Sequence, residues 1–150
     1  MGQYCFSTLV VSDNQEAVGT IVGIASALGE SVVVVDSKDN FLELYTPAVR
    51  CIVLDLSLRE SCGIEIIRHL AETKCRAPMV LTTPSSSKLL AVARNLAEAL
   101  GILVVDAVVE PFEVERLRAA MIAATDPAEV ARLRSRAAAA VQQAGRLRWC

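Results

Sequence analysis

The side chains best suited to chemistry stand where short apolar runs end. The run CIVLD ends on Asp55, and an earlier run, LVV, is followed by Ser12 and Asp13. Two later runs lead to Thr83 and Glu110 in the same way. A carboxylate at such a place either caps the loop that follows or takes part in chemistry. Asp55 considered by itself does not distinguish these alternatives.

The apolar runs have the length and composition of buried parallel strands. They are short, rich in Val, Ile and Leu, and separated by segments of helical periodicity, which favours a parallel sheet with helices on both faces. Five strands are expected, over residues 5–11, 31–35, 50–54, 78–82 and 102–107. Because parallel strands bring their carboxyl ends to one edge of a sheet, Asp13, Asp55, Thr83 and Glu110 should share one acidic cleft.

The segments between the strands predict helices through their apolar stripes. The first stripe consists of Val18, Ile21, Val22, Ala25 and Leu28. The second and third helices are expected over 37–44 and 63–73. The fourth should bury Leu89, Val92, Ala93, Leu96 and Leu100. The fifth, over 113–124, should turn Val114, Leu117 and Met121 inward. The chain is therefore predicted to be an α/β protein of five βα units.

Residues 126–150 are expected to form a separate C-terminal helix after a domain of residues 1–125. Asp126 is placed to cap it, Pro127 to occupy its first position and Glu129 to reach back to the cap. Beyond these, apolar residues recur in steps of three and four, at Val130, Leu133, Ala137, Ala140, Ala144 and Leu147. The stripe is short and mostly alanine, so a dimerising helix, a helix that folds back and a linker all remain open.

Composition excludes several classes of function. No stretch approaches the roughly 18 apolar residues of a membrane span, and no secretory signal is present, so a cytoplasmic protein is expected. The net charge of −2 argues against a nucleic-acid partner, and the arginines of the last helix are interpreted as a solvated face. The five cysteines are scattered and His69 is the one histidine, which argues against a zinc site or a disulfide framework. There is no glycine-rich phosphate loop.

The strand ends resemble those of the receiver domain of two-component response regulators. The resemblance covers about residues 5–124 and depends on four pieces: LVVSDN with Asp13, LDLSLRESCGIEII with Asp55 and Gly63, PMVLTT ending on Thr83, and VVEPF. It implies a doubly wound, flavodoxin-like sheet of strand order 2-1-3-4-5, followed here by the C-terminal helical extension. It also implies a signalling domain rather than an enzyme.

The resemblance further implies a phosphorylation switch. Asp55 would accept a phosphoryl group from a histidine kinase or a phosphotransfer protein. Asp13, Asp55 and the backbone carbonyl of Ser57 would hold Mg²⁺, which relieves the repulsion between a carboxylate and a phosphate. The hydroxyl of Thr83 would bond the phosphoryl oxygen. Glu110 precedes Pro111 at a bond that is cis in the family.

Three departures from the family pattern fall in this pocket. Ser12 stands in place of the first of two adjacent acids, Glu110 in place of a lysine, and Ala107 in place of a switching aromatic residue. Glu110 reverses the sign of a group that should grip the phosphoryl. The resulting hypothesis is that Asp55 is phosphorylated poorly or not at all, which would weaken or abolish Mg²⁺ binding as well.

Two classes of function therefore remain from sequence. The first is a phosphoryl-accepting switch that needs Asp55 and Mg²⁺, and the alternative is a phosphorylation-independent pseudo-receiver that acts through protein contacts. A homodimer through the helices of residues 111–150, and an output domain outside this chain, are compatible with both. Some pocket residues also have plainer explanations, since Asp13 could cap the first helix and Thr83 could belong to a turn.

Overall fold

The computed structural model describes residues 7–58, 62–84 and 87–148, and these form a single layered α/β unit. Its five strands are all parallel and lie in the order β2-β1-β3-β4-β5. The predicted fold class and strand order are therefore confirmed. The predicted start of the first strand, at Cys5 and Phe6, lies outside the described residues, as does Trp149.

The secondary structure alternates between strand and helix from β1 to α5, and a sixth helix follows. The strands are β1 (Thr8–Val11), β2 (Val32–Val35), β3 (Cys51–Asp55), β4 (Met79–Thr83) and β5 (Val104–Val109). The helices are α1 (Gln15–Ala27), α2 (Lys38–Leu44), α3 (Cys62–Glu72), α4 (Ser87–Ala99), α5 (Val114–Thr125) and α6 (Pro127–Arg148). The last three strands end one or two residues later than predicted. Asp55 and Thr83 are thus the final residues of β3 and β4.

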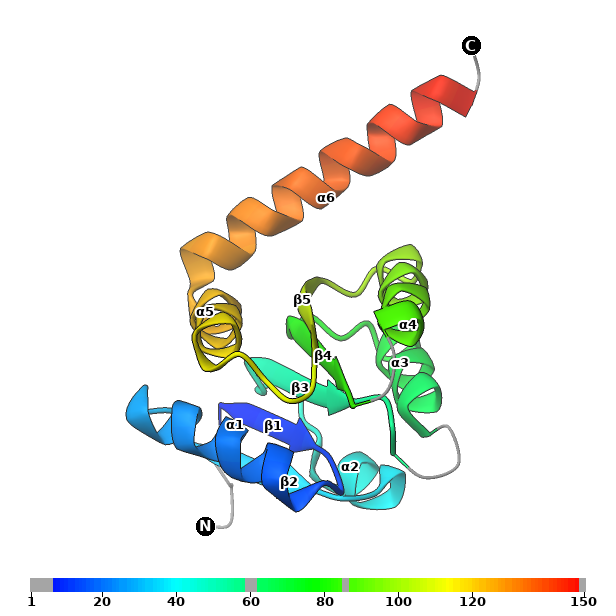
Figure 1. Ribbon diagram of the computed structural model, residues 1–150. Coiled ribbons are helices and arrows are strands. Elements are labelled where there is room, and N and C mark those ends of the chain that lie inside the picture. Colours follow the sequence, from blue (N-terminus) through cyan, green and yellow to red (C-terminus); the bar gives the residue numbers. More distant parts are fainter. Residues whose placement is uncertain (1–6, 59–61, 85–86, 149–150) are drawn as a thin grey trace.

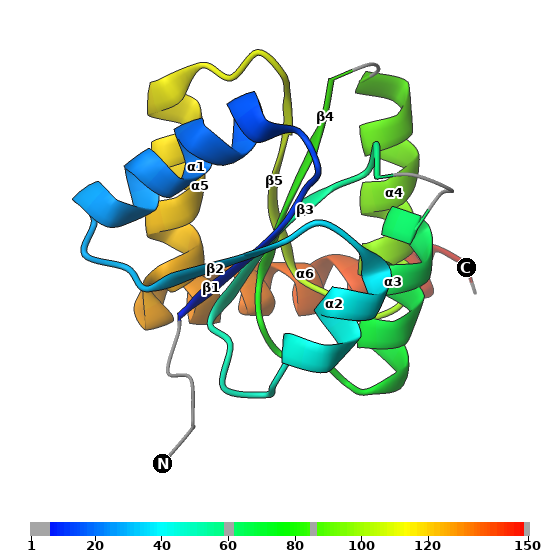
Figure 2. The ribbon, with the colours of Figure 1, turned by 90° about the horizontal axis from the view of Figure 1, so that it is seen from below.

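Helices cover both faces of the sheet, with α1 and α5 on one side and α2, α3 and α4 on the other (Figures 1 and 2). The three central strands, β1, β3 and β4, are fully buried, because their alternate side chains point to opposite faces and helices cover both faces. Leu9, Ile52 and Leu81 belong to the cluster under α2–α4. Val10 and Val53 belong to the cluster under α1 and α5. This explains why the strand sequences are continuous apolar runs rather than alternating ones.

Gly63, at the start of α3, is required by a close approach to the strand end that carries Asp55. A Cβ atom at this position would lie 3.1 Å from Cα of Leu56 and 3.3 Å from its Cδ2. Because the first of these is a backbone atom, it cannot move aside without shifting the turn after β3. The glycine therefore lets α3 begin directly beside Asp55.

The predicted apolar stripes of α4 and α5 were partly wrong. Helix α4 buries Leu90, Ala93 and Ala97, whereas Leu89, Val92 and Leu100 are exposed. In α5, Leu117 and Met121 are buried as predicted, but Val114 is 47% exposed. The small side chains of Ala93 and Ala97 allow α4 to pack closely on the sheet, which turns the larger apolar residues of the helix outward.

Helix α6 starts at Pro127 as predicted and runs back across the domain (Figure 1). Asp126 Oδ1 accepts a hydrogen bond of 3.0 Å from the Ala128 amide, as a cap should. Glu129 does not reach back to the cap, however, because it pairs with Arg132 at 3.0 Å. Among the described residues, no helix is both long enough and apolar enough to span a membrane.

The first half of α6 lies against the amino-terminal edge of the sheet. Arg134 donates to the carbonyl oxygen of Arg76, in the loop before β4, and Arg50 donates to that of Thr125 at 2.6 Å. Val130 and Leu133 are half-buried on this side. Residues 135–140 are exposed, including two alanines of the predicted stripe, Ala137 and Ala140. Of the predicted alternatives, the structure shows a helix that folds back along its first half.

Candidate functional site: the carboxyl edge of the sheet

The predicted site residues lie at the carboxyl edge of the sheet, where backbone hydrogen bonds link neighbouring strand ends. The Ser12 amide donates to the Val35 carbonyl at 3.0 Å, and the Leu56 amide donates to the Thr82 carbonyl at 2.8 Å. The amide of Glu110, one residue after β5, donates to the carbonyl of the last β4 residue at 2.9 Å. These backbone bonds fix the positions of the strand ends that carry the predicted site residues.

Asp55 is the buried carboxylate at the centre of this edge, with 1% of its surface exposed. Its Oδ2 accepts a hydrogen bond of 3.0 Å from Ser12 Oγ. Its Oδ1 accepts from the backbone amide of Ser57 at 2.8 Å and from Ser57 Oγ at 2.6 Å. Asp55 thus caps the turn after β3 while also facing the residue that follows β1. Of the two roles that the sequence leaves open for Asp55, the structure shows the cap, and a role in chemistry stays a prediction.

Ser12 and Asp13 have different surroundings although they are adjacent in sequence. Ser12 is buried and contacts Asp55, whereas Asp13 is exposed. The possible role of Asp13 as the cap of α1 is not what the structure shows. Asn14 is the cap, since its side chain accepts from the amides of Glu16 and Ala17 at 3.1 and 3.3 Å.

Thr83 is completely buried at the end of β4. Its neighbour Thr82 is also buried and is the register partner of Asp55 between β3 and β4. The carbonyl of Thr83 accepts from the Glu110 amide, so the ends of β4 and β5 are joined next to the acceptor position. The structure accordingly places Thr83 within β4 rather than in an exposed turn.

Glu110 brings a second carboxylate to the pocket. The Glu110–Pro111 peptide bond is cis, as expected from the sequence. Both carboxylate oxygens of Glu110 are buried, and neither has a hydrogen-bond partner among the described residues. Burial, followed by the charges of Asp55 and Glu16, raises the pKa of Glu110 to about 7. The position that the resemblance assigns to a cation therefore holds a carboxylic acid that is about half protonated at neutral pH.

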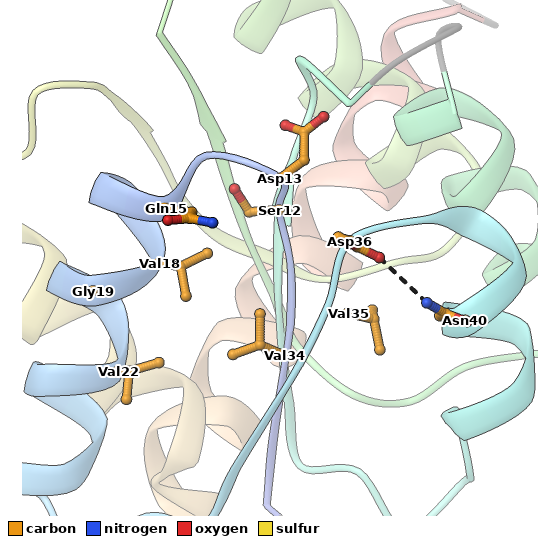
Figure 3. A pocket seen from close by; sticks show the side chains of 10 residues that line it. All are labelled: Ser12, Asp13, Gln15, Val18, Gly19, Val22, Val34, Val35, Asp36 and Asn40. Carbon is orange, nitrogen blue, oxygen red and sulfur yellow. Dashed lines mark hydrogen bonds between the residues drawn. The ribbon is translucent and has the colours of Figure 1, made fainter.

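A shallow cavity of about 540 Å³ opens beside Ser12 and Asp13, between α1 and β2 (Figure 3). Its upper end is polar, and its lower part is formed by the side chains of Val18, Val22 and Val34. Val34 is 40% exposed because β2 is an edge strand. Of the predicted site residues and their neighbours, this cavity contacts Ser12 and Asp13.

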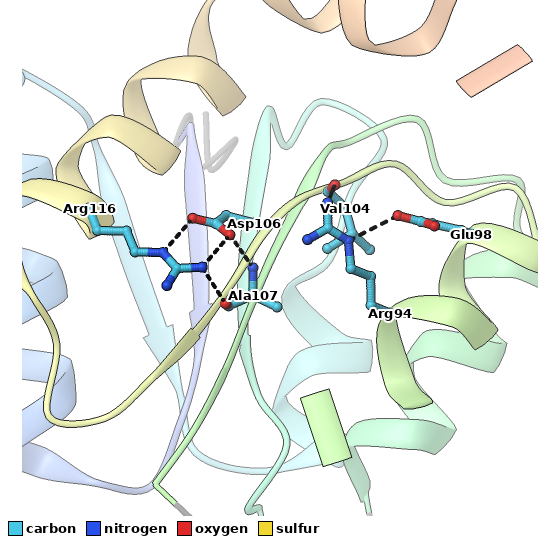
Figure 4. A network of polar contacts seen from close by, with 6 residues as sticks. All are labelled: Arg94, Glu98, Val104, Asp106, Ala107 and Arg116. Carbon is cyan, nitrogen blue, oxygen red and sulfur yellow. Dashed lines mark hydrogen bonds and ion pairs between the residues drawn. The ribbon is translucent and has the colours of Figure 1, made fainter. Parts of the chain in front are cut away.

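A polar network that was not predicted from sequence crosses the edge strand β5 (Figure 4). Arg116, on α5, donates to both carboxylate oxygens of Asp106 at 3.0 Å and to the Ala107 carbonyl at 3.1 Å. On the other side, Arg94 of α4 pairs with Glu98 and donates to the backbone of β5. The pKa of Asp106 is lowered because the bonds from Arg116 and the Ala107 amide outweigh its burial. At Ala107, where the family has its aromatic switch, this strand is held by an arginine clamp.

Of the two carboxylates predicted to hold Mg²⁺, the one at Asp55 is already occupied by hydrogen-bond donors. Mg²⁺ requires near-octahedral oxygen coordination, usually with one or two carboxylates. Here Asp55 is already engaged by Ser12 and Ser57, and Asp13 is exposed. Within the described parts of the chain, no group of three or more His, Cys, Asp or Glu side chains is arranged to hold a metal ion.

Comparisons with known proteins identify the fold. No protein-family model and no curated protein matches the sequence. A response regulator from Colwellia psychrerythraea is 27% identical with a TM-score of 0.69, over 81% of this chain and 98% of that one. DrrB of Thermotoga maritima, an OmpR/PhoB homologue, is 26% identical with a TM-score of 0.63, over 77% of this chain and 50% of that one.

The match to the response regulator StyR extends further along this chain. StyR is 22% identical with a TM-score of 0.68, over 97% of this chain and 69% of that one, so the shared fold includes most of α6. These neighbours confirm the recognition made from the strand ends. The chain thus has the fold of the receiver domains of response regulators.

Proposed function

We propose that this receiver domain serves two-component signalling mainly through protein contacts that do not require phosphorylation. Asp55 occupies the phosphoacceptor position but accepts a phosphoryl group poorly. The observation that carries this proposal is the buried carboxylate of Glu110, whose pKa is raised partly by the charge of Asp55. A group that already feels one negative charge at Asp55 would oppose the larger charge of a phosphorylated aspartate.

The size of the opposition is estimated from Coulomb's law. At a separation of about 6 Å and an effective dielectric constant near 20, an ionised Glu110 repels a phosphoryl group by roughly 3 kcal/mol per unit charge. The lysine of the family pattern would instead have contributed a charge-assisted hydrogen bond of about 1.5–3 kcal/mol. Because its pKa is about 7, Glu110 could escape this repulsion at neutral pH by taking up a proton, at a cost of about 0.4 kcal/mol. The combined difference is then about 2–3 kcal/mol, or a factor of roughly 30–200 in an equilibrium constant.

The hydrogen bonds of Asp55 support the same conclusion. Ser12 and Ser57 already satisfy its two oxygens, so a phosphoryl group would have to displace at least one of these donors. With Asp55 occupied in this way, the charge that a phosphoryl group brings would also lack its usual counterion, Mg²⁺.

The partners follow from the fold. Receiver neighbours imply contact with histidine kinases or phosphotransfer proteins, and several neighbours belong to longer regulators. A homodimer through residues 111–150 stays part of this proposal, because α5 presents Val114 and Ile122 to solvent and residues 135–140, 142 and 143 of α6 are exposed. An output domain beyond this chain is a further candidate.

Beryllofluoride with Mg²⁺ provides the direct test, because it mimics an acyl phosphate. We expect no change in the amide spectrum of residues 12, 55, 83 and 110 at millimolar beryllofluoride, and no phosphorylation by acetyl phosphate. A variant with Glu110→Lys is the matched control and should gain a response. Modification of the unaltered protein at millimolar levels would contradict the proposal.

Replacement of Asp55 by Asn separates the two classes of function in a signalling assay. The substitution keeps the size of the side chain and removes the nucleophile. Signalling that is unchanged supports contacts that do not depend on phosphorylation, and signalling that is lost supports the phosphoryl-accepting switch.

A further inference from the structure

A second cavity lies next to Glu110, on the side of α1 away from β2. It occupies about 360 Å³ between α1, the end of β4 and the loop from β5 to α5. Its walls are partly apolar, with Pro84, Phe112 and Val114 among them. Two acidic residues, Glu110 and Glu16, are also among the residues that line it. None of the described residues that line this cavity is basic.

The carboxylate of Glu110 lacks the donors that a buried acid needs. Both of its oxygens are buried and neither accepts a hydrogen bond within the described part of the chain. Buried polar groups are normally paired, so an unpaired carboxylate points to an absent donor. The nearby charges of Asp55 and Glu16 make the local potential negative, which favours a donor that carries positive charge.

The shape and chemistry of the cavity select an organic cation over a hydrated metal ion. Its apolar walls suit an aliphatic chain, as in the lysine and arginine side chains, which bury their stems while the charged head finds a partner. Phe112 offers a ring beside which a cation can also be stabilised. At the rim, Val114 is 47% exposed and provides an apolar surface of the kind that a protein partner covers.

We propose that this cavity receives a lysine or arginine side chain of a partner protein, whose cationic group pairs with the Glu110 carboxylate once the Glu110 side chain turns into the cavity. The inference deepens the proposed interaction function, because it names the chemistry by which a partner is recognised. It does not depend on whether Asp55 can be phosphorylated. The negative charge that opposes a phosphoryl group thus becomes the charge that selects a basic partner.

The test uses the complete chain and small probes that isolate the side-chain chemistry. N-acetyl-arginine methylamide and its lysine counterpart are titrated while the amides of Thr20, Glu110 and Phe112 are followed by NMR. N-acetyl-citrulline methylamide is the control, because citrulline has nearly the same shape without the charge. Saturable shifts with the two cations, at dissociation constants in the range of about 1–50 mM, are expected for a single side chain.

Variants assign the binding to the cavity. Glu110→Gln should weaken binding of the arginine probe by at least about fivefold, and Glu16→Gln, at the exposed first turn of α1, by about twofold. Glu115→Gln, on the exposed face of α5 outside the cavity, should leave it unchanged. The spectrum of each variant without probe establishes that it is folded, and Glu16→Gln keeps the test decisive if Glu110→Gln is not.

Four outcomes would overturn the proposal. They are equal binding of citrulline, no saturation by about 100 mM of either cation, binding that neither glutamate affects, and concentration-dependent shifts of the same amides without probe. The last outcome would assign the cavity to a second copy of the chain. A negative result leaves the beryllofluoride experiment at Asp55 untouched, so the two proposals fail independently.

Discussion

Ser12 donates a hydrogen bond of 3.0 Å to Oδ2 of Asp55, so the first residue after β1 directly contacts the acceptor-position carboxylate at the end of β3. The family pattern has an acid where this serine stands. A hydroxyl stabilises the carboxylate by donating to it, whereas a second acid would repel it and require a cation between them. In this pocket a hydroxyl donor therefore contacts Asp55 at the position where the family pattern places a second carboxylate.

Removal of the Ser12 hydroxyl should destabilise the fold. In Ser12→Ala, the buried Oδ2 of Asp55 loses a charge-assisted donor, and the expected loss in the free energy of unfolding is about 1.5–3 kcal/mol. Urea denaturation monitored by circular dichroism measures this loss. Ser26→Ala, at an exposed position of α1, is the control and should change the stability by less than about 0.5 kcal/mol. A loss equally small for Ser12→Ala would mean that the bond is replaced by water.

Glu110 should make the stability of the domain depend on pH near neutrality. Its pKa is about 7 in the folded protein, above the ordinary value of 4.5, so the folded state holds the proton more tightly than the unfolded state. The corresponding stability is fully present below about pH 4.5 and is lost as the pH rises through 7. Because the residue as a whole is half-buried and its charge is partly screened, we expect a loss of about 1 kcal/mol rather than the full equivalent of the shift.

Glu110→Gln is the variant that isolates this term. The variant should unfold with nearly the same free energy at pH 5.5 and 8, and it should exceed the unaltered protein in stability at pH 8. Glu115→Gln should retain the original pH dependence. Parallel pH profiles for the unaltered protein and Glu110→Gln would show that Glu110 does not titrate in this range.

Gly63 and Gly19 form a matched pair of glycines in helices. In Gly63→Ala the added methyl group would meet the Leu56 backbone at 3.1 Å, and a loss of about 1–3 kcal/mol in unfolding free energy is expected. In Gly19→Ala the new group would have no neighbour within 4 Å apart from the adjacent backbone of its own helix, and a gain of about 0.5–1 kcal/mol is expected from helix propensity. Thermal unfolding of the two variants should therefore shift in opposite directions. A shared direction would argue against the close approach of α3 to the end of β3.

Mg²⁺ should bind weakly or not at all to the unaltered protein. With Asp55 engaged by serine donors and Asp13 exposed, we expect no saturable shift of the amides of residues 12, 55 and 57 up to about 10 mM Mg²⁺. Ser12→Asp restores the adjacent acids and should bring binding into the millimolar range. Tight binding of Mg²⁺ by the unaltered protein would contradict this prediction and would support Asp55 as an active phosphoryl acceptor.

The parts of the fold that were predicted from sequence are those with a single physical explanation. The buried strands were recognised because a sheet covered on both faces leaves only apolar positions, and the parallel arrangement then fixed the edge at which Asp55 and Glu110 lie. The buried face of α4 was predicted wrongly because two adjacent positions, 89 and 90, both hold leucine, and only Leu90 is buried. Periodicity alone could not tell which row of side chains faces the sheet, and the alanines at 93 and 97 decide it through close packing.

The geometry of the site was less accessible from sequence than its location. The departure at Ser12 was visible, but its bond to Asp55 depends on how β1 and β3 are aligned. The ion pair between Arg116 and Asp106 joins a helix to a strand. Helical and strand periodicity relate residues within one element, so neither pattern could predict this pair. An acid on an edge strand followed by an arginine in the next helix is a signal that could have suggested it.

The first half of helix α6 is attached to the amino-terminal edge of the sheet, opposite the edge that carries Asp55. Arg50 holds the carbonyl of Thr125, just before the helix begins, and Arg134 within the first half of the helix bonds to Arg76. Residues 135–140 of the helix are exposed. A helix of this length extends about 33 Å, so a tilt of only about 5° at α5 would displace its far end by roughly 3 Å. Small repacking of the last βα unit would thus be amplified into a movement large enough for a neighbouring molecule to detect.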